Sequence, residues 1–279
     1  MMHMVRNEAE FSVLGMEYEL VPVVAEVPSA GRSASSLFRA LREGERFSFL
    51  MEGDGRDVHG GRYAVMGFDP LQRFVLYGGN AAEGSAFLGR LRGYVDGAGA
   101  FSDPLLPPFS GGLFGFFAYE ATAFFDDLFH CSPEKQLPGS ALPLAHFFAP
   151  GVVAVLDRRE GRILLIDYIE TAEKNDEQLS QAYRSAAAHL GEYAGRIEAI
   201  SIDDDLPPLA LKPFAPTICR ETFMERVTEA REAILGGEAY QIVLSQRFET
   251  DAPEDALLLY DALCRENPSP YHFFSIHRM

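Results

Sequence analysis

The sequence predicts an α+β protein in which antiparallel β-sheets are covered by packed helices, and two observations carry this prediction. Short apolar runs bounded by glycine, proline or charged turns indicate strands joined as hairpins. Longer stretches with apolar residues every three to four positions indicate helices between them. The 279 residues, 47% of them hydrophobic, are enough for about two domains of roughly 100–200 residues with a substantial core.

The first 200 residues contain most of the expected elements. We expect a strand over 17–27, a helix over 33–41, and a hairpin of strands 47–52 and 62–68 around a glycine-rich turn, with 74–77 continuing the pattern. A helix over 86–95, a proline-rich connection at 103–108 and a glycine-rich, aromatic segment at 110–128 follow. Strands 152–156 and 163–168 form the clearest hairpin, around the turn 157–161, and a long helix covers 174–200.

The stretch 201–216 is acidic and then rich in proline, which is typical of a linker. We therefore divide the chain into an N-terminal domain (1–205), a linker (206–217) and the start of a second domain (218–279). In the last part, a capping box at Thr222 and Glu225 predicts a helix that ends at Gly236-Gly237, followed by a strand over 239–249, a helix over 254–265 and a strand over 271–276. This part lacks further elements to cover its faces, so we expect the chain to be a truncated piece of something longer.

Composition excludes several classes of protein. A total of 24 Lys and Arg against 41 Asp and Glu gives a net charge of −17, which repels nucleic-acid backbones and anionic membrane surfaces. The three cysteines are far apart and show neither disulfide-scaffold nor zinc spacing. The uncharged stretch Leu137–Leu156 is broken by prolines, so we interpret it as a loop entering a buried strand rather than a membrane span. The N-terminus lacks the pattern of a secretory signal, and we expect a cytoplasmic protein.

Four segments, in this order, resemble the chorismate-utilising enzyme family, in particular component I of the anthranilate synthases. They are FLMEGDGRDVHGGRYAVMGFDP (49–70), GGLFGFFAYE (111–120), GGEAYQIVLSQRF (236–248) and NPSPYHFF (267–274). The resemblance implies an α+β fold and a reaction of chorismate with ammonia that yields anthranilate and pyruvate, in tryptophan biosynthesis. It also implies Mg²⁺ as the metal and a glutamine amidotransferase subunit (component II) as the partner that supplies ammonia, with tryptophan as feedback inhibitor and a homo-oligomer as a possible assembly.

The resemblance places the magnesium ligands and the acid–base residues of the family beyond this chain. No residue here matches those ligands, so we expect the chain alone to be inactive. Chorismate carries two carboxylates, and in a protein of net charge −17 the positive centre that meets them must be supplied locally.

Gln241 and Arg247 are the candidate catalytic-domain residues. Family members that add water to chorismate carry lysine at the position of Gln241, where it can act as a base, whereas a neutral amide cannot deprotonate water. Gln241 therefore indicates the ammonia-using branch and is our candidate catalytic residue; the alternative is an exposed polar residue on a strand. Arg247 is either a substrate-binding residue or the partner of a structural ion pair.

The candidate tryptophan site consists of Glu52, Gly53, Pro270, Tyr271 and His272. Where the family pattern reads Leu-Leu-Glu-Ser, this chain has Leu50-Met51-Glu52-Gly53, and His272 replaces a usual methionine. The lost serine hydroxyl removes a hydrogen bond worth about 0.5–1.5 kcal/mol, so we expect weakened or altered feedback. Gly53 can instead serve a tight turn that needs positive φ.

Two alternatives to the anthranilate synthase interpretation stay open. The first is component I of aminodeoxychorismate synthase, which resembles the same motifs but stops before pyruvate elimination. The second is a non-catalytic module that binds an effector or docks a subunit.

Overall fold

The structure is a computed structural model that describes residues 2–42, 44, 47–53, 61–77, 81–97, 101, 103–124, 142–201, 209 and 212–277. The chain divides into two compact units, residues 1–205 with 267–279 and residues 206–266. Residues 267–279, which we expected in the second domain, belong to the first unit because their strand joins its sheet. Residues 125–141, which include Cys131 and the end of the aromatic segment, lie outside the described residues.

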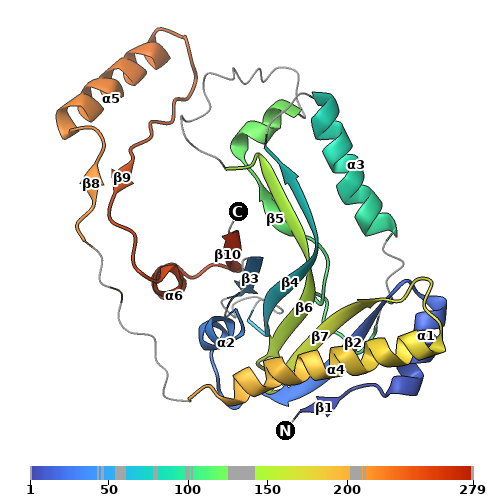
Figure 1. Cartoon of the computed structure of the whole chain (residues 1–279). Helices are drawn as coiled ribbons and strands as arrows, with labels where there is room; N and C mark the ends of the chain where they lie inside the picture. The colour runs from blue at the N-terminus through green and yellow to red at the C-terminus, as the bar shows by residue number, and fades with distance from the viewer. Residues whose placement is uncertain are drawn as a thin grey trace. The chain divides into compact units, whose positions relative to one another are not determined.

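The first unit is built on one antiparallel sheet, drawn from blue to yellow with one red strand in Figure 1. Its strands are β1 (His3–Met4), β2 (Leu20–Pro28), β3 (Phe47–Glu52), β4 (Tyr63–Leu76), β5 (Phe114–Phe117), β6 (Ala145–Asp157), β7 (Arg162–Glu170) and β10 (His272–His277). The order is β1-β2-β7-β6-β4-β3-β10, and β5 pairs with the first part of β6. The α+β class predicted from the sequence is confirmed.

Helices cover this sheet. They are α1 (Glu8–Glu17), α2 (Ala34–Leu41), α3 (Ala81–Gly97) and α4 (Asp176–Glu198), with a short 3-10 helix, η1, at Tyr119–Phe124. The long helix α4 runs across β7 and β2, and α1 and α2 pack against it (Figure 1). Its apolar face, which includes Leu179, Leu190 and Ile197, is fully buried, because residues at this spacing share one side of a helix.

Local signals account for the helix starts. Ser33 accepts a hydrogen bond from the backbone N–H of Ser36 and begins α2, and Asn175 forms a capping box with Gln178 at the start of α4. Helix α1, which we did not predict, begins at a capping box formed by Asn7 and Glu10. The Asn-x-x-Glu spacing was the signal that could have found it.

The second unit contains α5 (Arg220–Leu235), α6 (Ala256–Glu266) and a two-residue ladder between β8 (Ala215–Pro216) and β9 (Phe248–Glu249). The predicted strand over 239–249 is wrong except for its last two residues. A strand needs a hydrogen-bonding neighbour, and in the described part of this unit only β8 supplies one. The predicted capping box is also wrong, because α5 begins after Cys219 without a side-chain cap. The predicted end of this helix at Gly236-Gly237 is confirmed, with Gly237 at φ 78°.

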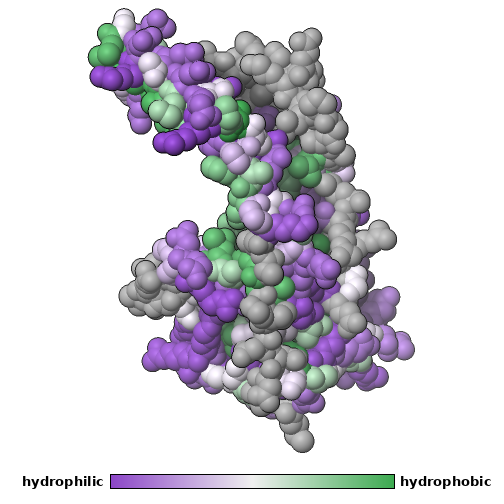
Figure 2. All heavy atoms as spheres, turned by 90° about the vertical axis from the view of Figure 1, so that its left-hand side faces the viewer, coloured by the Kyte–Doolittle hydropathy of each residue, from purple (hydrophilic) through white to green (hydrophobic). Residues whose placement is uncertain are grey.

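Helix α5 buries none of its residues, and large apolar side chains of the second unit face solvent. Figure 2 shows green hydrophobic spheres between purple hydrophilic ones over α5, at the upper left. Tyr240 is 95% exposed and Val243 83% exposed, although both belong to the apolar run predicted as a strand. The large apolar side chains of 239–249 are therefore mostly exposed.

Candidate functional site

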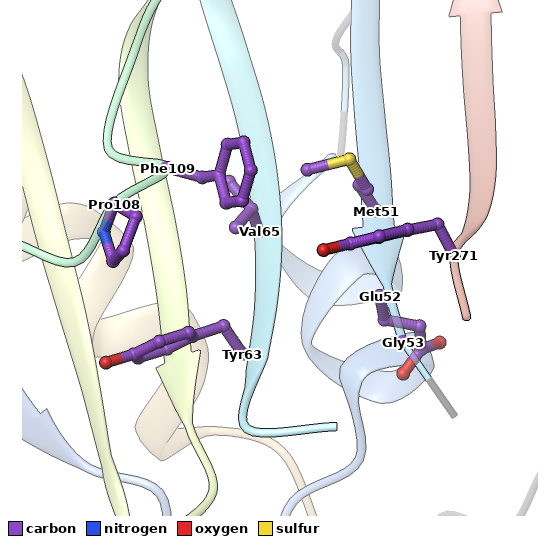
Figure 3. A pocket seen from close by; sticks show the side chains of 8 residues that line it. All are labelled: Met51, Glu52, Gly53, Tyr63, Val65, Pro108, Phe109 and Tyr271. Atoms are coloured by element: carbon purple, nitrogen blue, oxygen red, sulfur yellow. The ribbon is translucent and has the colours of Figure 1, made fainter. Parts of the chain in front are cut away.

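A pocket opens in the first unit at the ends of β3, β4 and β10. It encloses about 380 Å³ of space, including the part open to solvent. Its lining residues are Met51, Glu52, Gly53, Tyr63, Val65, Pro108, Phe109 and Tyr271. The pocket therefore joins three segments that lie far apart in the sequence, and Figure 3 shows their side chains.

Strand register brings these segments together. Leu50, Met51 and Glu52 of β3 pair with Met66, Val65 and Ala64 of β4 on one side and with Phe274, Phe273 and His272 of β10 on the other. Tyr271 directly precedes β10, so its ring lies next to β3. Pro108 and Phe109 come from the irregular segment that leads into β5 and close the opposite wall (Figure 3).

Most of the lining is apolar. In Figure 3 the side chains of Met51 and Tyr271 point toward Phe109 and Val65 across the opening. A second hollow shares Met51, Val65 and Phe109 with this pocket and continues toward Phe114, whose ring stacks on that of Phe49 with centroids 4.0 Å apart. Such a lining can receive a flat, apolar group.

Glu52 is the charged group among the lining residues, and its carboxylate forms an ion pair with the Arg158 guanidinium. Arg158 also donates a hydrogen bond of 3.1 Å to the carbonyl oxygen of Gly61. The side chain of Glu52 is 15% exposed and that of Arg158 is 35% exposed. An ammonium group that entered the pocket would therefore meet a carboxylate whose negative charge is already partly neutralised.

The structure brings together three of the five residues predicted for the tryptophan site. Glu52, Gly53 and Tyr271 line the pocket, whereas Pro270 is exposed and His272 is buried. Nε2 of His272 lies 3.0 Å from the carbonyl oxygen of Asn267, a contact that fixes the turn before β10. His272 is nevertheless linked to the site through the backbone, because it pairs with Glu52 across β10 and β3.

Sequence reasoning did not assign Tyr63, Val65, Pro108, Phe109 or Arg158 to this site. Tyr63 and Val65 could have been found, because alternate residues of the strand that pairs with β3 share a face. Pro108 and Phe109 lie in an irregular segment that has no periodicity to read.

Gln241 and Arg247 lie in the second unit. Gln241 is exposed on an extended segment that carries no strand pairing. Nη2 of Arg247 lies 2.6 Å from Oε1 of Glu249, with both side chains more than half exposed, which is the ion-pair arrangement. The carbonyl oxygen of Arg247 accepts a hydrogen bond of 2.9 Å from the Thr217 N–H and so fixes the local backbone.

The described residues do not provide a magnesium site, since no three His, Cys, Asp or Glu side chains among them come close enough to hold a metal ion. Among the same residues, no helix is both long and apolar enough to cross a membrane.

Comparison with known proteins identifies relatives of the chain. A family model described as chorismate binding enzyme matches residues 47–278. Anthranilate synthase component 1 of Mycolicibacterium smegmatis is 29% identical over 96% of this chain and 52% of its own length. The protein of the same name from Streptomyces coelicolor is 31% identical over 96% of this chain and 51% of its own length.

A crystal structure of anthranilate synthase component I from Streptococcus pneumoniae has a similar fold, with a TM-score of 0.52 and 23% identity over 78% of this chain and 49% of that one. The chain thus spans about half the length of the curated relatives it matches. Because the family model covers most of the sequence, including the pocket strands β3 and β4 and the segment of Gln241, the chain belongs to the family of chorismate-binding enzymes.

Proposed function

We propose that this chain is part of component I of an anthranilate synthase, which converts chorismate and ammonia to anthranilate and pyruvate in the cytoplasm. The observation that carries the proposal is the match to relatives of that name over 96% of the chain. We further propose that Mg²⁺ and a glutamine amidotransferase subunit act with the protein of natural length. The metal would offset the charge of the substrate carboxylates and of the leaving group.

Gln241 supports the ammonia-using chemistry. Its amide has no basic site at neutral pH, so it cannot activate water, whereas ammonia needs no base to act as a nucleophile. Arg247 supplies a positive charge six residues further on and is our candidate for binding a substrate carboxylate, although in the structure it pairs with Glu249.

The product of the reaction tests this proposal. The protein of natural length, given chorismate, ammonium and Mg²⁺, is expected to release anthranilate and pyruvate. A non-aromatic amino product that retains the enolpyruvyl group would instead identify an aminodeoxychorismate synthase. The variant Gln241→Lys is expected to lose anthranilate formation. In labelled water, it is expected to release a product of chorismate that contains ¹⁸O.

A matched control adds the same charge nearby. Gln246→Lys keeps a donor for the carbonyl oxygen of Ile218, to which the Gln246 amide now donates at 3.1 Å, and is expected to retain anthranilate formation. Equal losses in both variants would show that charge in this segment, rather than the chemistry of position 241, controls the reaction.

We also propose that the pocket in the first unit is the tryptophan site, and that it binds tryptophan weakly. The apolar lining supports a place for the indole ring, whereas Gly53 offers no hydroxyl and Glu52 is paired with Arg158. Restoring the hydroxyl with Gly53→Ser is expected to tighten binding about 2- to 13-fold, which corresponds to one neutral hydrogen bond of about 0.5–1.5 kcal/mol.

Calorimetric titration of the chain with tryptophan measures this effect. Gly89→Ser, at an open position of α3, is the control and is expected to leave affinity unchanged. Tyr271→Ala is expected to weaken binding, whereas Tyr119→Ala, which removes a ring that is 79% exposed and outside the pocket, is not. Unchanged affinity in Tyr271→Ala would refute the assignment of the pocket.

A further inference from the structure

A buried histidine, His146, and a half-buried one, His277, meet in the sheet of the first unit, away from the pocket. His146 of β6 has no exposed surface, and its Nδ1 atom lies 2.8 Å from Nδ1 of His277 in β10. The two residues are 131 positions apart, and their ring centroids are separated by 4.7 Å. This contact joins the edge strand β10 to β6 across two intervening strands of the sheet.

Aromatic side chains from three strands surround the pair. The ring centroid of Phe47, in β3, lies 5.4 Å from that of His146. The ring centroids of Phe116, in β5, and Phe148, in β6, lie 5.3 Å and 5.9 Å from that of His277. Neither Nε2 atom has a hydrogen-bond partner. Because the other nitrogens face each other, one neutral ring must donate through Nδ1–H and the other must accept there, so the two rings are opposite tautomers.

A metal does not explain this contact. Two nitrogen ligands on one tetrahedral metal at about 2.0–2.1 Å would lie about 3.3 Å apart, further than the two Nδ1 atoms are. Metal-bound imidazoles also donate their second N–H to an acceptor, and both Nε2 atoms lack one. The contact is therefore a hydrogen bond between neutral rings.

The surroundings oppose a positive charge on either ring. Burial, the neighbouring His277 and the Arg73 guanidinium lower the pKa of His146 to about 4, and burial lowers the pKa of His277. Arg73, on β4, lies over the Phe47 ring at 4.6 Å from its centroid. The Arg73 guanidinium acts on His146 by charge repulsion, and β3, β5 and β6 contribute aromatic rings around the pair.

Strand β10 has one paired neighbour among the described strands. Of the described strands, β10 pairs only with β3, over six residues from His272 to His277. Uptake of one proton adds a positive charge beside Arg73 in an apolar cage. Uptake of a second proton makes both rings cationic and places two Nδ1–H groups against each other at 2.8 Å. Separation of β10 returns both rings to water, where a charged imidazole is well solvated.

We propose that the His146–His277 pair is a proton-sensitive latch, which holds β10 on the sheet while both rings are neutral and releases it when they gain protons. Because Tyr271 directly precedes β10, release of the strand also removes one wall of the pocket described above. The latch itself does not depend on what that pocket binds.

Hydrogen exchange of the β10 amides in the full chain tests the proposal. For one ring whose pKa is about 4 in the closed state and 6.5 when released, protection factors corrected for intrinsic exchange should fall about 20-fold between pH 7 and pH 5. The double variant His146→Phe/His277→Phe keeps two rings in the aromatic cage but cannot take up protons, and its β10 protection should not change over this range. His189→Gln, a change at a histidine on α4, should retain the full decrease.

If the double variant folds poorly, a measurement on the wild-type chain still tests the proposal. Nitrogen-15 NMR of the wild-type histidines then reports the same event, since the His146 and His277 signals should shift together with the loss of β10 protection. The proposal is overturned if wild-type β10 protection changes less than about threefold between pH 7 and pH 5, or if the folded double variant keeps the decrease.

Discussion

Replacing Gly115 by alanine should separate β5 from β6. A Cβ atom on Gly115 would lie 2.1 Å from the carbonyl oxygen of His146 and 2.6 Å from Cα of Phe147, whereas ordinary contacts begin near 3.4 Å. Both atoms belong to the backbone of the paired strand, so no side-chain rotation relieves the clash. We expect a loss of stability near the upper end of the cost of overpacking, about 3 kcal/mol.

Urea denaturation followed by circular dichroism measures this change in the free energy of unfolding. The matched control is Gly89→Ala in α3, where an added Cβ meets no atom within 4 Å. That change should stabilise the helix by about 0.5–1 kcal/mol, because alanine has the higher helix propensity. If the free energy of unfolding of Gly115→Ala lies within about 0.5 kcal/mol of the wild-type value, the close approach of β5 to β6 is not a feature of the folded protein.

Two further predictions concern pH. Burial raises the pKa of Asp157, but two hydrogen bonds from Arg62, at 2.8 and 3.0 Å, and two backbone N–H groups outweigh burial, so its pKa lies below the usual 3.8. The resulting stability is present above pH 3.8 and is lost as pH falls through the folded-state pKa; Asp157→Asn should remove this part of the acid-unfolding curve. The hydrogen bond to Asp167 raises the pKa of His189, so its contribution is complete below pH 6.5 and is lost as pH rises through the folded-state pKa. Melting temperatures between pH 6 and 9 should show this slope in the wild type, and its persistence in His189→Gln would contradict the assignment.

Local patterns in the sequence were sufficient for several elements. The helix over 33–41 and the strand over 47–52 match α2 and β3, because a serine cap and a short apolar run act within a few residues. The turn 157–161 joins β6 to β7 as predicted, and Gly161 there has φ 65°, which suits glycine.

Pairing between distant segments could not be predicted in the same way. The run 239–249 has the composition of a strand, but a strand forms only where another strand supplies hydrogen bonds. Conversely, 271–276 was predicted as a strand of the second domain, and β10 pairs with β3 of the first unit. The contact of His146 with His277 depends on this pairing and has no signal in the sequence.

The candidate site was predictable to a similar extent. Resemblance to a family placed Glu52, Gly53 and Tyr271 at one site, and all three line the pocket. Phe109 and Arg158 were missed because each reaches the site from a loop or turn whose course is set by tertiary packing.

The pairing of β3 with β10 has a consequence for the order of folding. During synthesis, β3 leaves the ribosome about 220 residues before β10, a delay of roughly 10–40 s at about 5–20 residues per second. For that time the edge of β3 that later bonds β10 is open, while the rest of the sheet can already assemble. Unpaired edges of this kind invite association with other chains, so nascent protein that has reached about residue 205 should depend more on chaperones than the chain that includes β10.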